Sequence, residues 1–343
     1  MATRAWIPLV LTAALAACSG DGNGTNPFAV NTAEPAPDDT GDDDEAPPTA
    51  AGVPASLAGD VDQMIFDRAT QTLVVRGLSL DEVPVSATYT RRSDLDATYA
   101  GYKVYTAQDD PLDRHVTALF LESAGSGFNG QVRAGIAVTG GPRNRYFGGG
   151  YYERDGDFDA PAISRTSGMV SYAGDYVGLT NIDARDGMLL EVDPATPIEL
   201  RPARAAQITG KIFLNADFAD NRVEGNVYNR VLVPRGQTMP SLVLLATDID
   251  QDGVFAGDVE FDSYQTDPEL RDIGQTVGND VGDYGGLFGG PDAAAVAGIV
   301  RLEAVDGSNN IRGYEGEEEY GVFVLGKCGT SGATSPVCDD VRR

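Results

Sequence analysis

Apolar and polar residues alternate most clearly along residues 208–231 of this 343-residue chain. Apolar side chains occupy every second position from Ile212 to Phe218, and the alternation resumes after residue 222. A period of two places successive side chains on opposite faces of an extended chain, as a half-buried strand requires. Between the two arms, residues 219–221 read Ala-Asp-Asn, which suits a tight turn. The pattern therefore predicts a β-hairpin.

Shorter apolar runs bounded by turn residues predict further strands on both sides of this hairpin. No segment from 56 to 165 has the apolar spacing of a helix. The expected strands before residue 165 are a hairpin over 62–76 that turns at 67–70, and then 98–106, 116–122, 131–139 and 144–153. Those after residue 165 are 169–181, 188–192, 242–248, 254–264, 296–304 and 320–327, together with the two arms of the hairpin.

The second half of the chain thus contains about eight expected strands. Eight antiparallel strands close a small barrel whose interior is filled by side chains, and closure removes exposed sheet edges. We therefore expect an all-β protein, with a small β-rich domain over 56–165 followed by an eight-stranded antiparallel β-barrel over 166–343. Helices between residues 170 and 325, or an open two-layer sheet there, would contradict this expectation.

The N-terminus has the pattern of an export signal. Arg4 precedes an apolar run over 5–15, and small residues lead to Cys18, which predicts a signal peptide over 1–18. The run is shorter than the roughly 20 residues that span a bilayer. Residues 15–18, Leu-Ala-Ala-Cys, resemble the lipobox of bacterial lipoproteins. That resemblance implies diacylation of Cys18, and Ser19 after it favours the outer membrane; an ordinary secreted protein is the alternative.

The composition of residues 19–55 is dominated by Gly, Asn, Asp, Pro, Thr and Ala. Such a segment buries too little apolar surface to offset its chain entropy, so we expect a disordered acidic tether. The whole chain carries 52 acidic and 25 basic side chains, a net charge of −27. This charge repels nucleic acids and anionic lipid head groups, so neither is expected as a partner.

Two of the three cysteines lie close together near the C-terminus. Export implies an oxidising compartment, so Cys328 and Cys338 are expected to pair as a disulfide. A metal site is the alternative, but no histidine or third cysteine lies near them.

Several motifs in the second half resemble one known family. They are Ser-Tyr-Ala-Gly-Asp-Tyr-Val-Gly at 171–178, Ala-Asp-Phe at 216–218, and Gly-Leu-Phe-Gly-Gly-Pro-Asp-Ala at 286–293 followed by Val-Ala-Gly-Ile-Val at 296–300. In this order they resemble the barrel of the transferrin-binding protein B family of surface lipoproteins, over about 165–327. The chain departs from the family pattern by an extra glycine in 287–291, by Ala295 where Glu is usual, and by Ala297 where Gly is usual.

This resemblance implies a handle domain followed by a barrel, displayed on the outer surface of a Gram-negative cell. The chain has room for a single such lobe. Smaller single-lobe relatives bind haem, haemoglobin or other host proteins, or have no assigned ligand. The resemblance therefore implies an iron- or haem-carrying protein ligand, and a TonB-dependent receptor as a further partner.

Residues 248–253, Asp-Ile-Asp-Gln-Asp-Gly, match the first half of a calcium-binding loop. Asp248, Asp250 and Asp252 would supply the oxygen ligands. The twelfth position should be Glu but is Val259, and the flanking runs predict strands. A tight acidic hairpin turn is therefore the other interpretation.

Aromatic residues surround the three glycines at 148–150. Tyr146, Tyr151 and Tyr152 are candidates for ligand contact, because tyrosine offers a large contact area at low entropic cost. They are equally suited to the core of two strands. The sole histidine, His115, is a candidate haem ligand or an ordinary half-buried residue.

No nucleophile-elbow pattern or dinucleotide-binding fingerprint stands before a predicted helix, and no Cys/His metal spacing occurs in the sequence. We therefore expect a non-catalytic outer-membrane lipoprotein that binds a ligand, and the family resemblance implies a role in iron or haem acquisition. The ligand is expected on loops at one end of the fold, because the barrel interior is filled. The alternative is a structural or protective surface protein that acts through protein contacts.

Overall fold

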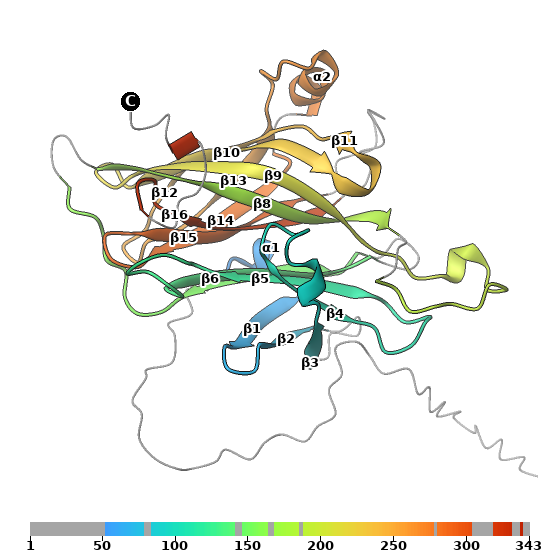
Figure 1. The fold of residues 1–343 in the computed structure, drawn as a ribbon. Coiled ribbons are helices and arrows are strands. Elements are labelled where there is room, and N and C mark those ends of the chain that lie inside the picture. The colour runs from blue at the N-terminus through green and yellow to red at the C-terminus, as the bar shows by residue number, and fades with distance from the viewer. Residues whose placement is uncertain are drawn as a thin grey trace, which may run out of the picture.

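The computed structural model describes residues 52–78, 84–140, 146–163, 168–184, 188–277, 280–303, 318–330 and 337–338. The predicted signal peptide, the acylation site Cys18 and nearly all of the predicted tether lie outside these residues. Within them, two antiparallel sheets pack against each other (Figure 1). Among the described residues, none of the helices is both long and apolar enough to cross a membrane.

The first sheet, called the handle sheet here, contains seven strands that pair in sequence order. Its first hairpin turns where predicted: the Asp67 carboxylate accepts hydrogen bonds from the amides of Ala69 and Thr70, at 2.7 and 3.2 Å. Such side-chain bonds to the backbone favour a turn. The strands are β1 (Val61–Asp67), β2 (Thr72–Leu78), β3 (Pro84–Arg91), β4 (Lys103–Ala107), β5 (Val116–Glu122), β6 (Val132–Thr139) and β7 (Gly148–Arg154).

The handle sheet rolls up until its two edges nearly meet. A short helix, α1 (Ala55–Ala58), leads into β1. Just before β1, the Asp60 amide donates to the Gly148 carbonyl of β7 at 3.0 Å, and the Gly148 amide donates to the Asp60 carboxylate at 3.1 Å. A side chain at Gly149 would lie 1.8 Å from the Ala58 carbonyl, so this approach requires glycine.

The second sheet closes into a barrel. Its eight main strands follow the order β10-β12-β13-β14-β15-β16-β8-β9, and β9 pairs with β10 to complete the cylinder. The predicted all-β class, with a β-rich first half and an eight-stranded barrel, is confirmed. The strands are β8 (Met169–Ala184), β9 (Arg204–Asp217), β10 (Arg222–Leu232), β12 (Leu242–Asp248), β13 (Val254–Phe261), β14 (Gly282–Gly289), β15 (Ala295–Leu302) and β16 (Glu319–Gly326), with a two-residue β11 (Gln237–Thr238) beside β10.

The hairpin that the alternating pattern predicts is β9 and β10. Ile212, Leu214 and Ala216 are buried in the barrel, and the intervening side chains are more exposed. Asn221 adopts a left-handed backbone conformation with φ of 53°, as the turn interpretation expects. The turn amides of Ala219 and Asp220 donate to the Asp217 carboxylate, which lies two positions before the predicted turn and was not predicted to take part in it.

The barrel count of eight is right, but its membership differs from the prediction. Residues 188–192 form no strand, and Leu190 is exposed. The missing strand is β14, whose glycines resemble a turn; Gly286 is needed there because a side chain would lie 2.4 Å from the Ala297 carbonyl. Apolar content alone therefore misplaced one strand.

Other boundaries also need correction. Strand β3 was not predicted, and residues 98–102 form turns before β4. Strand β7 starts at Gly148, later than expected. One helix, α2 (Pro268–Val277), lies within residues 170–325, where none was expected. It connects β13 to β14 and is not part of the sheet, so the sheet still closes, and its Leu270 packs in the barrel's hydrophobic cluster (Figure 1).

The handle sheet and the barrel share a hydrophobic core. Leu119 and Ile136 of the handle sheet pack with Val177, Ile299 and Val322 of the barrel wall. Separate clusters fill the barrel interior and the inside of the rolled handle sheet. Figure 1 shows β5 and β6 lying along the barrel wall. Burial of this shared surface holds the two sheets together.

Candidate functional site

The barrel has two unlike ends. At one end, here called the turn end, strands are joined by the short segments 218–221, 249–253 and 290–294. At the opposite end, long segments connect the strands, and a handle-sheet connection lies beside them. The loop end is defined here as the described residues 108–115, 188–203, 233–241, 262–277 and 280–281. The 188–203 segment extends beyond the strands at the right of Figure 1.

Exposed large apolar side chains gather at the loop end. Tyr264, between β13 and α2, is 91% exposed. Scattered exposed apolar residues are ordinary, but a concentration of them marks an interaction surface. Six of the nine such residues in the described part of the chain lie there: Leu112, Leu190, Ile198, Leu200, Val233 and Tyr264; the others are Ile65, Ile163 and Met169.

Hydrogen bonds join the handle and barrel parts of the loop end. The Leu190 amide donates to the Gln108 side-chain oxygen at 2.9 Å. The Gln108 side-chain amide donates to the Asp113 carbonyl at 3.2 Å. Within 188–203, the Arg201 guanidinium donates to the Thr196 carbonyl at 2.9 Å and so shapes the segment. The two sheets therefore present one joined surface at this end.

The loop end is acidic. Burial and the nearby Asp110 carboxylate raise the pKa of Asp113. A surface with this charge favours a partner with basic groups. The loop end contains eleven acidic side chains (Asp109, Asp110, Asp113, Glu191, Asp193, Glu199, Asp262, Asp267, Glu269, Asp272 and Asp280) and four arginines (Arg114, Arg201, Arg235 and Arg271).

A buried ion pair lies beneath the loop end, inside the barrel. Arg230 of β10 donates to Glu319 of β16 and, at 2.6 Å, to the Pro240 carbonyl in the β10–β12 connection. The Tyr176 hydroxyl of β8 donates to the other Glu319 oxygen at 2.6 Å. Burial and the Glu319 charge raise the pKa of Tyr176. The members of this cluster are far apart in the chain, so no local pattern in the sequence predicts it.

Glycines make room for this cluster. A side chain at Gly321 would lie 1.8 Å from the Tyr176 hydroxyl, and one at Gly178 would lie 2.3 Å from Glu319 Oε1. Gly178 belongs to the 171–178 motif quoted above. These glycines are the one sequence signal for the cluster, although they do not identify its charged members.

The predicted calcium loop forms a hairpin turn between β12 and β13. The Asp250 carboxylate accepts hydrogen bonds from the amides of Asp252 and Val254, at 2.9 and 2.8 Å. The Arg154 guanidinium of β7 donates to the Asp252 carbonyl, and Asp248 ends β12. No group of three or more His, Cys, Asp or Glu residues in the described part of the chain is arranged to hold a metal ion. Calcium binding by this loop stays a prediction.

Two of the three candidate tyrosines, Tyr151 and Tyr152, belong to β7, and the third, Tyr146, lies just before it. Tyr151 and Tyr152 are almost fully buried, and the Tyr151 hydroxyl donates to Glu153 at 2.9 Å. Tyr146 is half-buried, and its hydroxyl donates to the Leu179 carbonyl at 2.5 Å. They therefore occupy core positions, which was the second interpretation, and ligand contact by them stays a prediction.

The remaining candidates are His115 and the cysteine pair. His115 is 1% exposed at the start of β5. Cys328 and Cys338 form a disulfide with a Cα–Cα distance of 5.1 Å. The Cys328 amide donates to the Ser171 carbonyl at 2.8 Å, which attaches the disulfide-closed segment near the start of β8.

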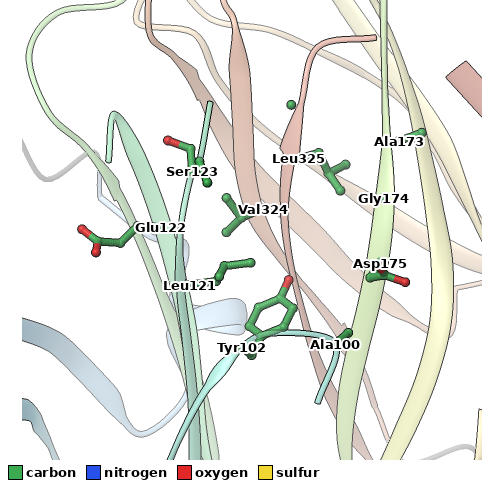
Figure 2. A pocket seen from close by; sticks show the side chains of 12 residues that line it. Ala100, Tyr102, Leu121, Glu122, Ser123, Ala173, Gly174, Asp175, Val324 and Leu325 are labelled. Carbon is green, nitrogen blue, oxygen red and sulfur yellow. The ribbon is translucent and has the colours of Figure 1, made fainter. Parts of the chain in front are cut away.

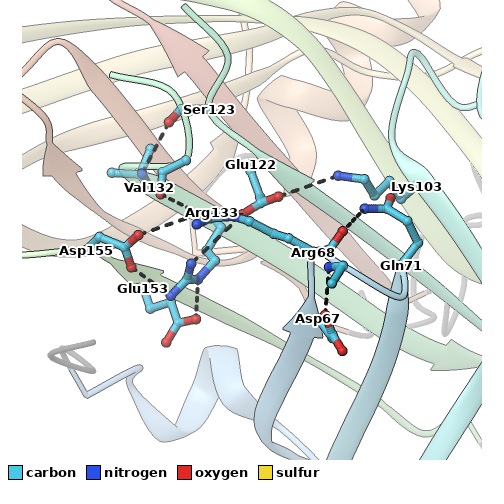
Figure 3. Close-up of polar contacts among 12 residues, drawn as sticks. Asp67, Arg68, Gln71, Lys103, Glu122, Ser123, Val132, Arg133, Glu153 and Asp155 are labelled. Atoms are coloured by element: carbon cyan, nitrogen blue, oxygen red, sulfur yellow. Dashed lines mark hydrogen bonds and ion pairs between the residues drawn. The ribbon is translucent and has the colours of Figure 1, made fainter. Parts of the chain in front are cut away.

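Charged side chains of the handle sheet, on strands β4 to β7 and in the turn between β1 and β2, pair with one another (Figure 3). Glu122 accepts from Arg68 at 2.8 Å and lies 3.5 Å from Lys103. Arg133 pairs with Glu153 and, at 2.9 Å, with Asp155. Because these side chains are paired with one another, little of their charge remains for a partner.

Comparisons with known proteins found several similar solved structures, all at low sequence identity and low TM-score. No family model matches the chain, and no curated protein matches its sequence. The isotype 1 transferrin-binding protein B from serogroup B Neisseria meningitidis is similar in structure, with 14% identity over 78% of this chain and 53% of that one, at a TM-score of 0.33. The transferrin-binding protein B of Haemophilus parasuis Hp5 is 12% identical over 75% and 51%, at a TM-score of 0.33.

A further similar structure, a surface lipoprotein, is 14% identical over 79% of this chain and 99% of its own length, at a TM-score of 0.31. The chain spans about half the length of the transferrin-binding proteins that it matches.

Proposed function

We propose that this protein is a non-catalytic surface lipoprotein that binds a protein ligand through its loop end. The gathering of long connections and exposed apolar side chains at that end is the observation that carries the proposal. Interaction surfaces of this kind are commonly built from loops held by a rigid scaffold. The closed barrel and the handle sheet supply that scaffold.

The barrel interior does not offer the ligand a site. Tyr172, Phe255 and Phe288 fill it near the turn end, with ring centroids 5.2 Å apart for Phe255–Phe288 and 5.4 Å apart for Tyr172–Phe288. The Arg230–Glu319 pair fills it near the loop end. A ligand therefore binds the outside of the fold. The burial of His115, the sole histidine, also argues against a catalytic triad.

The chemistry of the loop end describes the ligand. Apolar side chains among acidic ones suit a protein that presents basic residues around an apolar patch. By the resemblance of its motifs, the ligand belongs among iron- or haem-carrying proteins, and a TonB-dependent receptor would accept the cargo. We assign residues 56–165 to the handle domain and 166–343 to the barrel domain.

Anchoring is part of the same proposal. Diacylation of Cys18 would hold the chain in the outer membrane, because two acyl chains give stable attachment. The 37-residue tether over 19–55 reaches at most about 130 Å when fully extended. That reach would let the loop end meet a soluble ligand away from the membrane.

Binding measurements on matched variants test the proposal. The full-length chain with Cys18→Ser is immobilised, and haemoglobin, transferrin and free haem are passed over it separately. We expect one of them to bind, and a Leu112→Ser/Ile198→Ser/Leu200→Ser variant to lose at least about tenfold in affinity, as when apolar hot spots are removed.

The control variant carries Ile163→Ser and Met169→Ser, which change exposed apolar residues elsewhere on the surface. It should bind as the parent does. Equal losses in both variants would contradict a loop-end site, and failure of all three probes to bind would favour the structural or protective alternative.

A further inference from the structure

A cleft of about 170 Å³ lies where the handle sheet meets the barrel wall (Figure 2). Leu121 to Ala124, at the end of β5, form one side of it. Ala173 to Asp175 of β8 and Val324 to Gly326 of β16 form the other side. Tyr102 and Ala100, just before β4, lie beneath them. This cleft lies on the side of the molecule and is separate from the loop end.

The barrel ladder is interrupted at the floor of this cleft. Strands β8 and β16 pair from Val177 to Thr180, and a single bridge joins Tyr172 to Lys327. Residues 173–176 and 323–326, between these pairings, have no ladder partner across β8 and β16. This interrupted stretch is called the seam here. The Val324 backbone, within this stretch, is hydrogen-bonded to the Tyr102 hydroxyl instead.

Tyr102 contacts β16 at the point where the ladder stops. Its hydroxyl donates to the Val322 carbonyl of β16 at 3.1 Å, at the last residue of the regular pairing. The tyrosine is 1% exposed, so the handle sheet inserts it against the seam. Burial raises the pKa of Tyr102, and the Asp175 carboxylate raises it further. The negative field of Asp175 thus reaches the inner end of the cleft.

The charges around the cleft favour a cation. Figure 2 shows the Glu122 carboxylate directed away from Leu121 and Val324, and the handle network binds it. Asp175 is the other carboxylate in the lining. Lys211 bonds to its Oδ1, but both side chains are 44% exposed, and exposed pairs are weak. A ligand ammonium can therefore share Asp175 through Oδ2.

The size of the cleft limits the ligand to about one ring. Drug-sized ligands occupy pockets of about 300–1,000 Å³, whereas an engineered cavity of about 150 Å³ holds benzene. Leu121, Val324 and the Tyr102 ring offer an apolar surface for such a group. We propose that this cleft is a binding site for a small amphiphilic amine, with its ring on the apolar side chains and its ammonium on the Asp175 carboxylate.

Three probes of nearly equal size but different charge test this site. Benzylamine, benzyl alcohol and benzoate are titrated into the full-length chain with Cys18→Ser, and methyl NMR signals of Leu121, Val324 and Leu325 are followed. We expect benzylamine to shift these signals and to bind about fivefold tighter than benzyl alcohol. One charge pair about 4 Å apart in water gives that ratio. Benzoate should bind weakest.

Two variants keep the result interpretable. Ala173→Phe places a ring in the cleft and should abolish the shifts, whereas Asp175→Asn should remove the preference for the amine and retain benzyl alcohol binding. A folded Asp175→Asn protein shows that loss of preference is not loss of structure. The proposal fails if no probe shifts the three signals, if benzoate binds best, or if Asp175→Asn leaves the order of affinities unchanged.

Discussion

The turn end and the loop end of the barrel are built in opposite ways. At the turn end, Phe218, Phe255 and Phe288 pack together, with centroids 5.0 Å apart for Phe218–Phe288 and 5.2 Å apart for Phe255–Phe288. The connections there are tight turns. At the loop end, the interior carries the Arg230–Glu319 pair, and the connections above it are long, acidic and partly apolar on their surface.

The difference separates stability from recognition. Aromatic packing and short turns give the turn end much buried contact and little freedom. A buried ion pair adds less net stability, but it fixes which strands meet, because breaking it leaves an uncompensated charge. The loop end therefore has a defined floor beneath connections whose surface residues contribute little to folding. The predictions below test that division.

The largest effect is expected from removal of the Arg230 guanidinium. Arg230→Met should lower the free energy of unfolding by about 3–5 kcal/mol, because it leaves Glu319 buried without its cation. Denaturant unfolding measures the change. The Arg230→Met/Glu319→Leu variant, which removes both charges, should recover most of the loss. If the double variant is as unstable as the single one, the pair matters through its packing, and the division above is wrong.

The disulfide beside the turn end gives the next effect. Cys328→Ser/Cys338→Ser should lower the free energy of unfolding by about 2–3 kcal/mol, since the disulfide joins residues 10 positions apart and closes the loop between them. Thermal unfolding with and without reductant measures it. The parent should lose the same stability in reductant, and the variant should be insensitive to it. Ligand binding at the loop end should not change in either case.

Arg154 should contribute less than the disulfide. Its guanidinium donates to the carbonyls of Asp252 and, at 3.2 Å, Gly156, and it lies over the Phe158 ring. Burial lowers the pKa of Arg154. Arg154→Leu should cost about 1–3 kcal/mol, the range for buried groups that lose a charged hydrogen-bond partner.

The same variant examines the predicted calcium loop. The guanidinium already places a positive charge beside Asp250 and Asp252. Added calcium should therefore raise the melting temperature of Arg154→Leu more than that of the parent. If calcium raises the melting temperature of both proteins equally, or that of the parent more, the arginine does not compete with calcium for these aspartates.

Elements whose pattern lies within one stretch of sequence were predicted, and elements that depend on a distant strand were not. The alternation that predicted β9 and β10 is read within one stretch, and so is the chemistry of the 67–70 turn. Strand β14 was missed because Gly286 is there for a neighbouring carbonyl, a requirement set by a distant strand. Residues 188–192 were misassigned because an exposed apolar run and a buried strand look alike in sequence.

The same limit applies to the sites. The expectation that loops at one end carry the ligand followed from a filled barrel, and it did not identify Leu112, Ile198 or Leu200. The Arg230–Glu319 pair joins residues 89 positions apart, and no local pattern connects them. The cleft at the seam depends on where a ladder stops, which only the assembled barrel reveals.

The smallest effect is expected at the junction of α1 and β7, where Asp60 lies beside Gly148. Burial raises the pKa of Asp60 above its ordinary value of 3.8, although the Gly148 amide and Arg301 oppose the change. Between the ordinary and the raised pKa, the folded state holds more protons than the unfolded state. Stability therefore falls as pH rises through that window.

Asp60→Asn removes this contribution and keeps an oxygen that can accept the Gly148 amide. We expect the parent to lose stability relative to the variant as pH rises from 3.8 through the raised value, as measured by unfolding at a series of pH values. Glu318 also has a raised pKa through burial, so Glu318→Gln is the matched control and should shift the curve in the same direction. A parent that gains stability over Asp60→Asn in that window would mean that the Gly148 and Arg301 contacts outweigh the burial of Asp60.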